Sequence, residues 1–165
     1  MDTVKRTLRN PIAVDAALIT LAREEGVDPS EYTTEILSRH VLQCGALDKI
    51  DAKQIRAEMA IKQSARALAK SICARKFDSH VTLKVFQNIR SDATLYETYK
   101  SAIGADGLDR RNPTQARINR SLGGIIKATV NGQPRTEVGN KLSIAVQGEL
   151  IRTYTPLEKA ARNTA

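Results

Sequence analysis

The sequence predicts a mainly α-helical protein with short β-structure near its two ends, and two observations support this fold class. Over several segments, apolar residues recur three and four positions apart, as they do on one face of an amphipathic helix. Two helix start signals, Asn10-Pro11 and Asp28-Pro29, each place a capping side chain before a proline that suits the first helical turn. The β-prone stretches lie before the first of these helices and after the last predicted helix.

Breaks in this pattern divide the chain into four segments. Residues 1–45 are expected to hold a short strand and two helices, with Gly26 between the helices. Residues 46–80 are expected to form a long basic connecting helix. Three helices and a small β-hairpin are expected in residues 81–157, followed by a flexible tail in residues 158–165.

The short strand of residues 3–9 needs a partner. A strand of seven residues cannot satisfy its backbone hydrogen bonds or bury one face alone, and no second strand is close in sequence. An antiparallel ribbon between two copies of the chain would provide the partner, with four helices covering its inner face. The apolar residues for that cover lie at helical spacing in the two segments that follow: Ile12, Val14, Leu18, Ile19 and Leu21, then Tyr32, Ile36, Leu37 and Val41.

This order of strand, helix, glycine turn and helix resembles the ribbon-helix-helix family of Arc-type repressors. The residues that carry the resemblance are TLRNP, the fifteen-residue step from Pro11 to Gly26, and GVDPSEYTTEIL, so that it covers about residues 2–43. The resemblance implies a homodimer that inserts its two-stranded ribbon into the major groove of double-stranded DNA. With Leu8 facing inward, the base-reading side chains would be Lys5, Thr7 and Arg9.

The resemblance also implies phosphate contacts beside the ribbon. Arg6 is an inward position that usually holds an apolar residue, and its long side chain would reach a phosphate instead. The start of the second helix would offer backbone N–H groups of Val27 and Ser30 to another phosphate. Asp28 caps that helix, however, and its carboxylate would weaken this contact. The alternative is an ordinary strand and helical hairpin that merely dimerise.

The long helix, expected from about Asp51 to Phe77, has an apolar seam of Ile61, Ala65, Leu68 and Ile72. This seam favours packing on the helix's own domain or on a dimer mate. The alternative is a basic helix lying along DNA.

Residues 81–155 resemble a winged helix-turn-helix domain in their order of elements. Helices are expected over 81–90 and 93–103, and a third begins at Pro113 with Ile118, Leu122, Ile125 and Ile126 buried. KLSIAVQ and ELIRTYTPL, separated by Gly148, would form the hairpin. The third helix would turn a polar face outward as a second DNA-binding helix, and the expected contact residues are Arg110, Arg111, Thr114, Gln115, Arg117, Asn119, Arg120 and Lys127. The alternative is a basic helix on an interaction domain.

Charge and composition narrow the range of possible functions. The net charge is +8, and residues 111–165 alone carry nine basic and three acidic residues. Such basic clusters indicate a polyanionic partner, although they can also form a plain solvated surface. The absence of Trp, with only four Tyr and two Phe, counts against a single-strand binder that stacks bases. No apolar run is long enough to span a membrane and no signal-peptide core follows the N-terminus, so a cytoplasmic location is expected.

The sequence offers little for catalysis. It contains no phosphate-binding loop, no nucleophile elbow and no HExxH motif. His40, Cys44, Cys73 and His80 could share a metal only in principle, because their spacing lacks paired ligand turns. We therefore expect no enzyme activity, no cofactor and no metal.

Together these features predict a homodimeric, sequence-specific DNA-binding protein of bacterial or phage type that acts as a transcriptional repressor by occupying an operator. One alternative is an accessory protein of a plasmid or phage origin complex. Another is an antitoxin-like interaction protein with an unidentified protein partner, which the folded, basic C-terminal half disfavours.

Overall fold

Six helices and six short strands make up the part of the chain that the computed structural model describes, which is residues 7–25, 27–105 and 111–160. The mainly helical prediction is confirmed. The helices are α1 (Ile12–Glu25), α2 (Pro29–Gln43), α3 (Lys49–Ile72), α4 (Val81–Ser91), α5 (Ala93–Ile103) and α6 (Pro113–Thr129). The strands are β1 (Gly132–Pro134), β2 (Thr136–Glu137), β3 (Asn140–Lys141), β4 (Ile144–Ala145), β5 (Thr153–Tyr154) and β6 (Leu157–Lys159).

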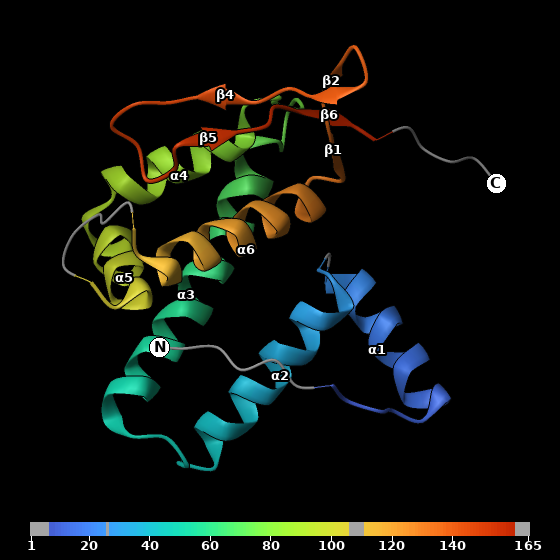
Figure 1. Ribbon diagram of the computed structural model, residues 1–165, viewed down its shortest axis with the longest axis vertical. Coiled ribbons are helices and arrows are strands. Elements are labelled where there is room, and N and C mark those ends of the chain that lie inside the picture. The colour runs from blue at the N-terminus through green and yellow to red at the C-terminus, as the bar shows by residue number, and fades with distance from the viewer. Residues whose placement is uncertain (1–6, 26, 106–110, 161–165) are drawn as a thin grey trace.

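The main core lies among α3, α4, α5 and α6 (Figure 1). The apolar row predicted for the third C-terminal helix is confirmed, because Ile118, Leu122, Ile125 and Ile126 of α6 are all buried. Ile118, Leu122 and Ile126 share this core with Ile61 and Ala65 of α3, Val85, Phe86 and Ile89 of α4, and Tyr99 of α5.

The long helix α3 is part of this core. The seam predicted for it is present, with Ile61 and Ala65 buried and Leu68 and Ile72 packed against the core. The seam faces α4, α5 and α6 of the same chain, as the prediction of packing on the helix's own domain requires, so α3 belongs to the core as well as connecting it to the N-terminal helices. The α3–α6 bundle, as we call these four helices, forms a single packing unit.

The strands form three antiparallel pairs. The predicted hairpin is confirmed by the pairing of β4 with β5, in which Ile144 lies opposite Tyr154. A small β2–β3 hairpin was not predicted. The third pair joins β6 to β1, with Leu157 opposite Pro134, so residues 158 and 159 belong to a strand and their assignment to a flexible tail was wrong.

Leu157 anchors the end of the described chain to the core. Its side chain is buried, and its backbone N–H donates to the Ser79 carbonyl at 2.9 Å. Across the pair, a Cβ on Gly132 would lie 3.0 Å from Leu157 Cδ1, so a side chain at this position would push against the leucine.

The helical hairpin α1–α2 lies to one side of the α3–α6 bundle, with α2 nearer to it (Figure 1). The predicted start of α2 is confirmed: Pro29 is its first residue, and Asp28 Oδ1 accepts a hydrogen bond from the Ser30 N–H at 2.9 Å. A small second core of Ala22, Val27 and Ile125, with Tyr32 packed against it, joins the hairpin to α6.

The predicted strand of residues 3–9 falls only partly within the described residues. Residues 7–10 have no regular secondary structure in this single chain, and residues 1–6 lie outside the described part. The ribbon between two copies therefore stays a prediction. Within the described part, no helix is both long enough and apolar enough to cross a membrane.

Replacing Leu122 with alanine should lower the free energy of unfolding by about 3 kcal/mol, because the side chain is fully buried among four helices and its removal leaves a cavity. The matched control is Ile50→Ala, at an exposed position on α3, which should change stability by less than about 0.5 kcal/mol. Urea unfolding followed by circular dichroism measures both. Equal losses in the two variants would contradict the core described here.

Candidate functional site

The exposed apolar side chains of the protein gather on its N-terminal part. Among the described residues, seven of the nine large apolar side chains that are exposed lie between residues 8 and 37. We call them the N-terminal apolar surface, and they are Leu8, Ile12, Val14, Ile19, Leu21, Ile36 and Leu37. Ile12 is 89% exposed, and α1 buries only Ala22. Exposed apolar patches are typical of interaction sites, which makes this surface a candidate for one.

A hollow beside this surface has the same character. It measures about 750 Å³ and is lined by residues from the segment before α1, from α1 and α2, and from α3. Its apolar walls come from Leu8, Leu18, Leu37, Val41 and Ile55, and Ser30, Thr33 and Thr34 add hydroxyl groups. The hairpin thus presents both an apolar surface and a recess.

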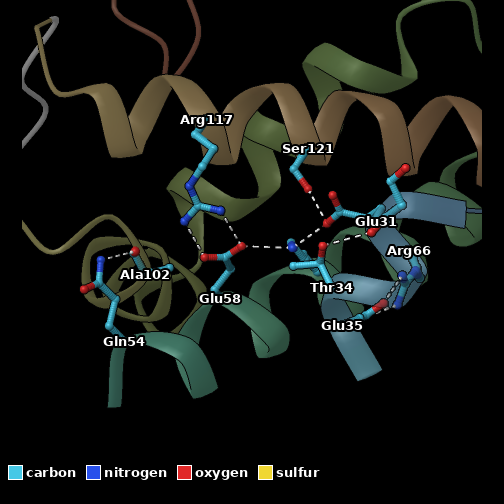
Figure 2. A network of polar contacts seen from close by, with 11 residues as sticks. Glu31, Thr34, Glu35, Gln54, Glu58, Arg66, Ala102, Arg117 and Ser121 are labelled. Carbon is cyan, nitrogen blue, oxygen red and sulfur yellow. Dashed lines mark hydrogen bonds and ion pairs between the residues drawn. The ribbon is translucent and has the colours of Figure 1, made fainter. Parts of the chain in front are cut away.

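Buried charges hold α2 against α3 and α6. Lys62 Nζ of α3 lies 2.5 Å from Glu31 Oε1 of α2 and 2.9 Å from Glu58 Oε1. Arg117 of α6 donates two hydrogen bonds to the Glu58 carboxylate, at 2.8 and 2.6 Å. Ser121 Oγ completes this network of polar contacts by donating a hydrogen bond to Glu31 Oε1 at 2.8 Å. Figure 2 shows Arg117 and Ser121 pointing from α6 toward these two carboxylates.

A second ion pair lies next to this network. Arg66 Nη2 of α3 is 3.0 Å from Glu35 Oε2 of α2, and both side chains are largely buried (Figure 2). Glu31 and Glu35 are one helical turn apart on α2, as Lys62 and Arg66 are on α3. The two helices therefore meet through matched rows of opposite charge, which fix how one lies against the other.

The environment shifts the pKa values of the network in the directions that keep it charged. Burial alone would raise the pKa of Glu58, but the Arg117 hydrogen bond and the Lys62 charge outweigh burial and lower it. Burial alone would lower the pKa of Lys62, but the Glu58 charge and the Glu31 hydrogen bond raise it above its ordinary value. The hydrogen bond to Glu58 likewise raises the pKa of Arg117. Each buried charge thus depends on its partners.

The residues predicted to contact DNA through the ribbon are only partly visible. Thr7 and Arg9 are exposed, while Lys5 and Arg6 lie outside the described residues. The predicted phosphate clamp at the start of α2 is wrong, because its two N–H groups are already used. The Val27 N–H donates to the Ala22 carbonyl, and the Ser30 N–H donates to Asp28.

The polar face predicted to point outward from α6 in fact faces the protein. Thr114 and Gln115 are buried, and their N–H groups donate to Asn112 Oδ1 at the helix start. Asn119 donates to the Leu150 carbonyl at 2.8 Å and accepts from the Tyr99 hydroxyl at 2.7 Å. Arg117 likewise binds Glu58. All four side chains are therefore buried or engaged within the protein, and their assignment to an outward-facing polar surface was wrong.

Three other residues predicted to contact DNA through this helix are exposed, as expected. Arg111, Arg120 and Lys127 are exposed, and Arg110 lies outside the described residues. The sequence shows which residues of α6 are polar. It does not show that the Leu150 carbonyl, in the segment before β5, accepts hydrogen bonds from Gln115 and Asn119.

The four candidate metal ligands do not come together. Cys44 Sγ lies 3.6 Å from His40 Nε2 on α2, whereas His80 Nδ1 lies 2.7 Å from the Tyr154 hydroxyl near the strands. No cluster of three or more His, Cys, Asp or Glu side chains that could hold a metal occurs in residues 7–25, 27–105 and 111–160.

Replacing Glu58 with glutamine should lower stability at neutral pH by about 3 kcal/mol, because it leaves Arg117 and Lys62 without their shared carboxylate. It should also reduce the acid sensitivity of folding. Since the pKa of Glu58 is lowered in the folded protein, its contribution is complete above its ordinary value of 4.5 and is lost as the pH falls through the folded value.

The measurement is urea unfolding at several pH values between about 7 and 3. Glu97→Gln is the control, because Glu97 forms an ion pair with Lys100 but is mostly exposed, and it should cost less than about 1 kcal/mol. The network would not have the stated role if the Glu58 variant and the wild type lost stability equally on acidification.

No protein-family model matches this chain, and no curated protein and no solved structure matches it either. Inference about its function therefore rests on the chain's own features. The foremost of these are the N-terminal apolar surface, the buried charges that orient α2, and the basic residues of the sequence.

Proposed function

We propose that two copies of this chain associate through the N-terminal apolar surface and that the dimer binds double-stranded DNA in a sequence-specific way. The observation that carries the proposal is the exposure of seven large apolar side chains on or next to α1 and α2. At about 25 cal/mol per Å² of apolar area removed from water, covering such a surface contributes several kcal/mol to association.

A second copy is the partner that fits best. The β-prone residues 3–9 require a strand partner, and an identical strand from a second chain supplies one in antiparallel pairing. Leu8 is exposed beside α1 and lines the hollow formed with α1, α2 and α3. A ribbon of two such strands would place both copies of Leu8 over the four helices of the two hairpins.

DNA is the partner suggested by charge and by residue type. The chain carries a net charge of +8, and Thr7 and Arg9 are exposed just before α1. On the outer face of the proposed ribbon, Lys5, Thr7 and Arg9 alternate with inward residues, and Arg and Lys suit the acceptor atoms of guanine in the major groove. Occupying an operator in this way would exclude polymerase and repress transcription.

The α3–α6 bundle would contribute to DNA binding through charge rather than through base reading. Arg111, Arg120 and Lys127 are exposed on or before α6, whereas its amide side chains are engaged within the protein. The winged helix-turn-helix resemblance therefore adds only phosphate attraction to the proposal.

A protein partner is the second candidate, and the same apolar surface favours it. An antitoxin-like protein would use this surface to hold a different chain rather than a second copy of itself. The oligomeric state of the purified protein separates the two candidates.

Replacing Leu37 with glutamate should convert a dimer into a monomer, because it places a charge on the N-terminal apolar surface, at a residue that also lines the hollow. The control is Val138→Glu, at a fully exposed position between β2 and β3, which should leave the dimer intact. Sedimentation equilibrium over a range of concentrations measures the mass. A wild type that stays monomeric at about 100 μM, a concentration at which even weak dimers form, would contradict the homodimer.

The double variant Lys5→Ala/Arg9→Ala should lose its preference for a selected DNA site while keeping weak, salt-sensitive binding. The control is Lys141→Ala/Lys159→Ala, which removes the same charge from exposed positions in β3 and β6. Duplexes enriched from a random library and scrambled versions of them are compared by fluorescence anisotropy across a salt series. The ribbon assignment fails if no sequence is enriched, or if both double variants keep the site preference.

A further inference from the structure

The side of α3 that faces away from the core carries a continuous row of exposed residues. These residues recur three or four positions apart, which places them on one face of the helix. The core residues Ile61, Ala65 and Ala69 lie on the opposite side. We call this row the α3 outer face, and its members are Lys53, Arg56, Ala60, Gln63, Ala67 and Lys70.

Every charged residue of the α3 outer face is basic. The two acids of α3, Asp51 and Glu58, lie on the opposite side of the helix, where Glu58 pairs with Lys62 and Arg117. An exposed helix whose charges serve solubility alone commonly mixes acids with bases at spacings of three and four residues. The separation of the two signs onto opposite sides of α3 therefore favours an anionic partner for its outer face.

The position of Lys53 along the helix supports this interpretation. Lys53 and the exposed Lys49, which continues the row, lie in the first two turns of α3. The N-terminal end of a helix carries partial positive charge, so lysine there does not stabilise the helix. Lys70 in the last turn suits the helix dipole, whereas the two N-terminal lysines need another explanation.

Two hollows border the α3 outer face, and each is lined by cations. Figure 1 shows α3 between α5 and the N-terminal hairpin. Lys53 and Arg56 line a hollow of about 640 Å³ that α3 forms with α5. Arg39 of α2 and Lys70 line a second hollow, of about 410 Å³, on the side of the hairpin. Within residues 7–25, 27–105 and 111–160, none of these four cations forms an ion pair.

Most acidic side chains that line these two hollows have other partners. Glu97 pairs with Lys100 at 2.6 Å, and Glu35 pairs with Arg66 at 3.0 Å. Among the described residues, Glu25 is the remaining acid in either wall, so four unpaired cations face one unpaired acid. The hollows therefore keep an excess of positive charge, which attracts phosphate groups.

The dimensions of α3 fit a nucleic acid duplex. At about 1.5 Å per residue, Lys53 and Lys70 are about 26 Å apart along the helix axis. This separation equals about eight base pairs at about 3.4 Å each, and it exceeds the major-groove width of about 12 Å. Basic side chains at the two ends can therefore reach phosphates on both sides of a groove. Ala60 and Ala67 between them are small and exposed, which lets the helix approach closely.

We propose that the α3 outer face lies against the phosphate backbones of double-stranded DNA. Lys53 and Arg56 bind phosphates at one end and Lys70 at the other, and such contacts raise the affinity for every duplex sequence alike. The choice of DNA rests on the proposed function, but the contacts require neither the ribbon nor dimerisation. They are also separate from Arg120 and Lys127, because α6 packs on the opposite side of α3.

Fluorescence anisotropy with a random-sequence duplex of about 20 base pairs, measured across a salt series, tests the proposal. The test variant of the full-length protein is Lys53→Gln/Arg56→Gln, since glutamine keeps a high helix propensity. The control is Lys141→Gln/Lys159→Gln, which removes the same charge from exposed positions in β3 and β6. Thermal unfolding verifies that both double variants stay folded.

We expect the two double variants to differ in their salt dependence. Each lost phosphate contact lowers the slope of log affinity against log salt by about 0.9, so the Lys53→Gln/Arg56→Gln protein should lose about 1.8 of that slope. At about 0.1 M salt it should bind about tenfold or more weakly than the wild type. The control protein should keep the wild-type slope and affinity.

Lysine acetylation provides a readout that does not depend on affinity. The wild-type protein is treated with acetic anhydride with and without saturating duplex, and mass spectrometry measures the modification of each lysine. Bound duplex should slow the acetylation of Lys53 and Lys70 several-fold, while Lys141 and Lys159 should react at the same rate in both samples.

The inference is overturned if folded Lys53→Gln/Arg56→Gln protein keeps the wild-type salt slope, or if duplex leaves the acetylation of Lys53 and Lys70 unchanged. Binding to vesicles of anionic phospholipid but to no duplex would also overturn it and identify a membrane surface instead. Failure of the ribbon gives a different result. The wild type would then prefer no sequence, while the Lys53→Gln/Arg56→Gln protein would still lose salt slope.

Discussion

One buried ammonium group determines how the two halves of this protein fit together. Lys62 of α3 lies between Glu31 of the N-terminal hairpin and Glu58 of its own helix, and Arg117 of α6 holds Glu58 from the other side. Lys62 and Glu58 are the two largely buried charges, and neither would be stable there without its partners. The position of α2 is therefore fixed, because every charged group in the network must keep its partners. Hydrogen bonds and ion pairs depend on direction, whereas apolar contacts do not.

The α3–α6 bundle is held together in a different way from the hairpin. The α3–α6 bundle is held by a continuous apolar core that includes Phe86, Tyr99 and Leu122, whereas the hairpin shares only the small cluster around Ala22, Val27 and Ile125 with it. Charge orients the hairpin, and most of its large apolar side chains stay exposed. This division explains why α1 can expose most of its apolar residues and still be part of a defined structure.

Local signals in the sequence were enough to predict the helices. Asp28-Pro29 fixes the start of α2, and the spacing of Ile118, Leu122, Ile125 and Ile126 identifies the buried side of α6. The opposite side of α6 was misread because a polar side chain facing water and one facing a backbone carbonyl look alike in sequence. Gln115 and Asn119 meet Leu150, more than thirty residues later, and no local pattern indicates that contact.

The ion-pair network was missed, although a signal for it exists. Glu31 and Glu35 are four residues apart, and Lys62 and Arg66 repeat that spacing with the opposite charge. Complementary rows of this kind predict that two helices meet, but they do not give the third member, Arg117, whose partner depends on how α6 crosses α3. The strand β6 was missed for a related reason, since its partner β1 lies on the far side of a long intervening segment.

The pairing of β6 with β1 has a consequence for the order in which the chain can assemble during synthesis. The ribosome releases the N-terminal part of a protein first, so α3, α4 and α5 are available long before Leu157 emerges. Leu157 then joins three places at once: the Ser79 carbonyl before α4, Pro134 of β1, and the apolar core. A nascent chain that stops short of β6 thus holds all six helices but leaves that end of the core open to chaperones and proteases.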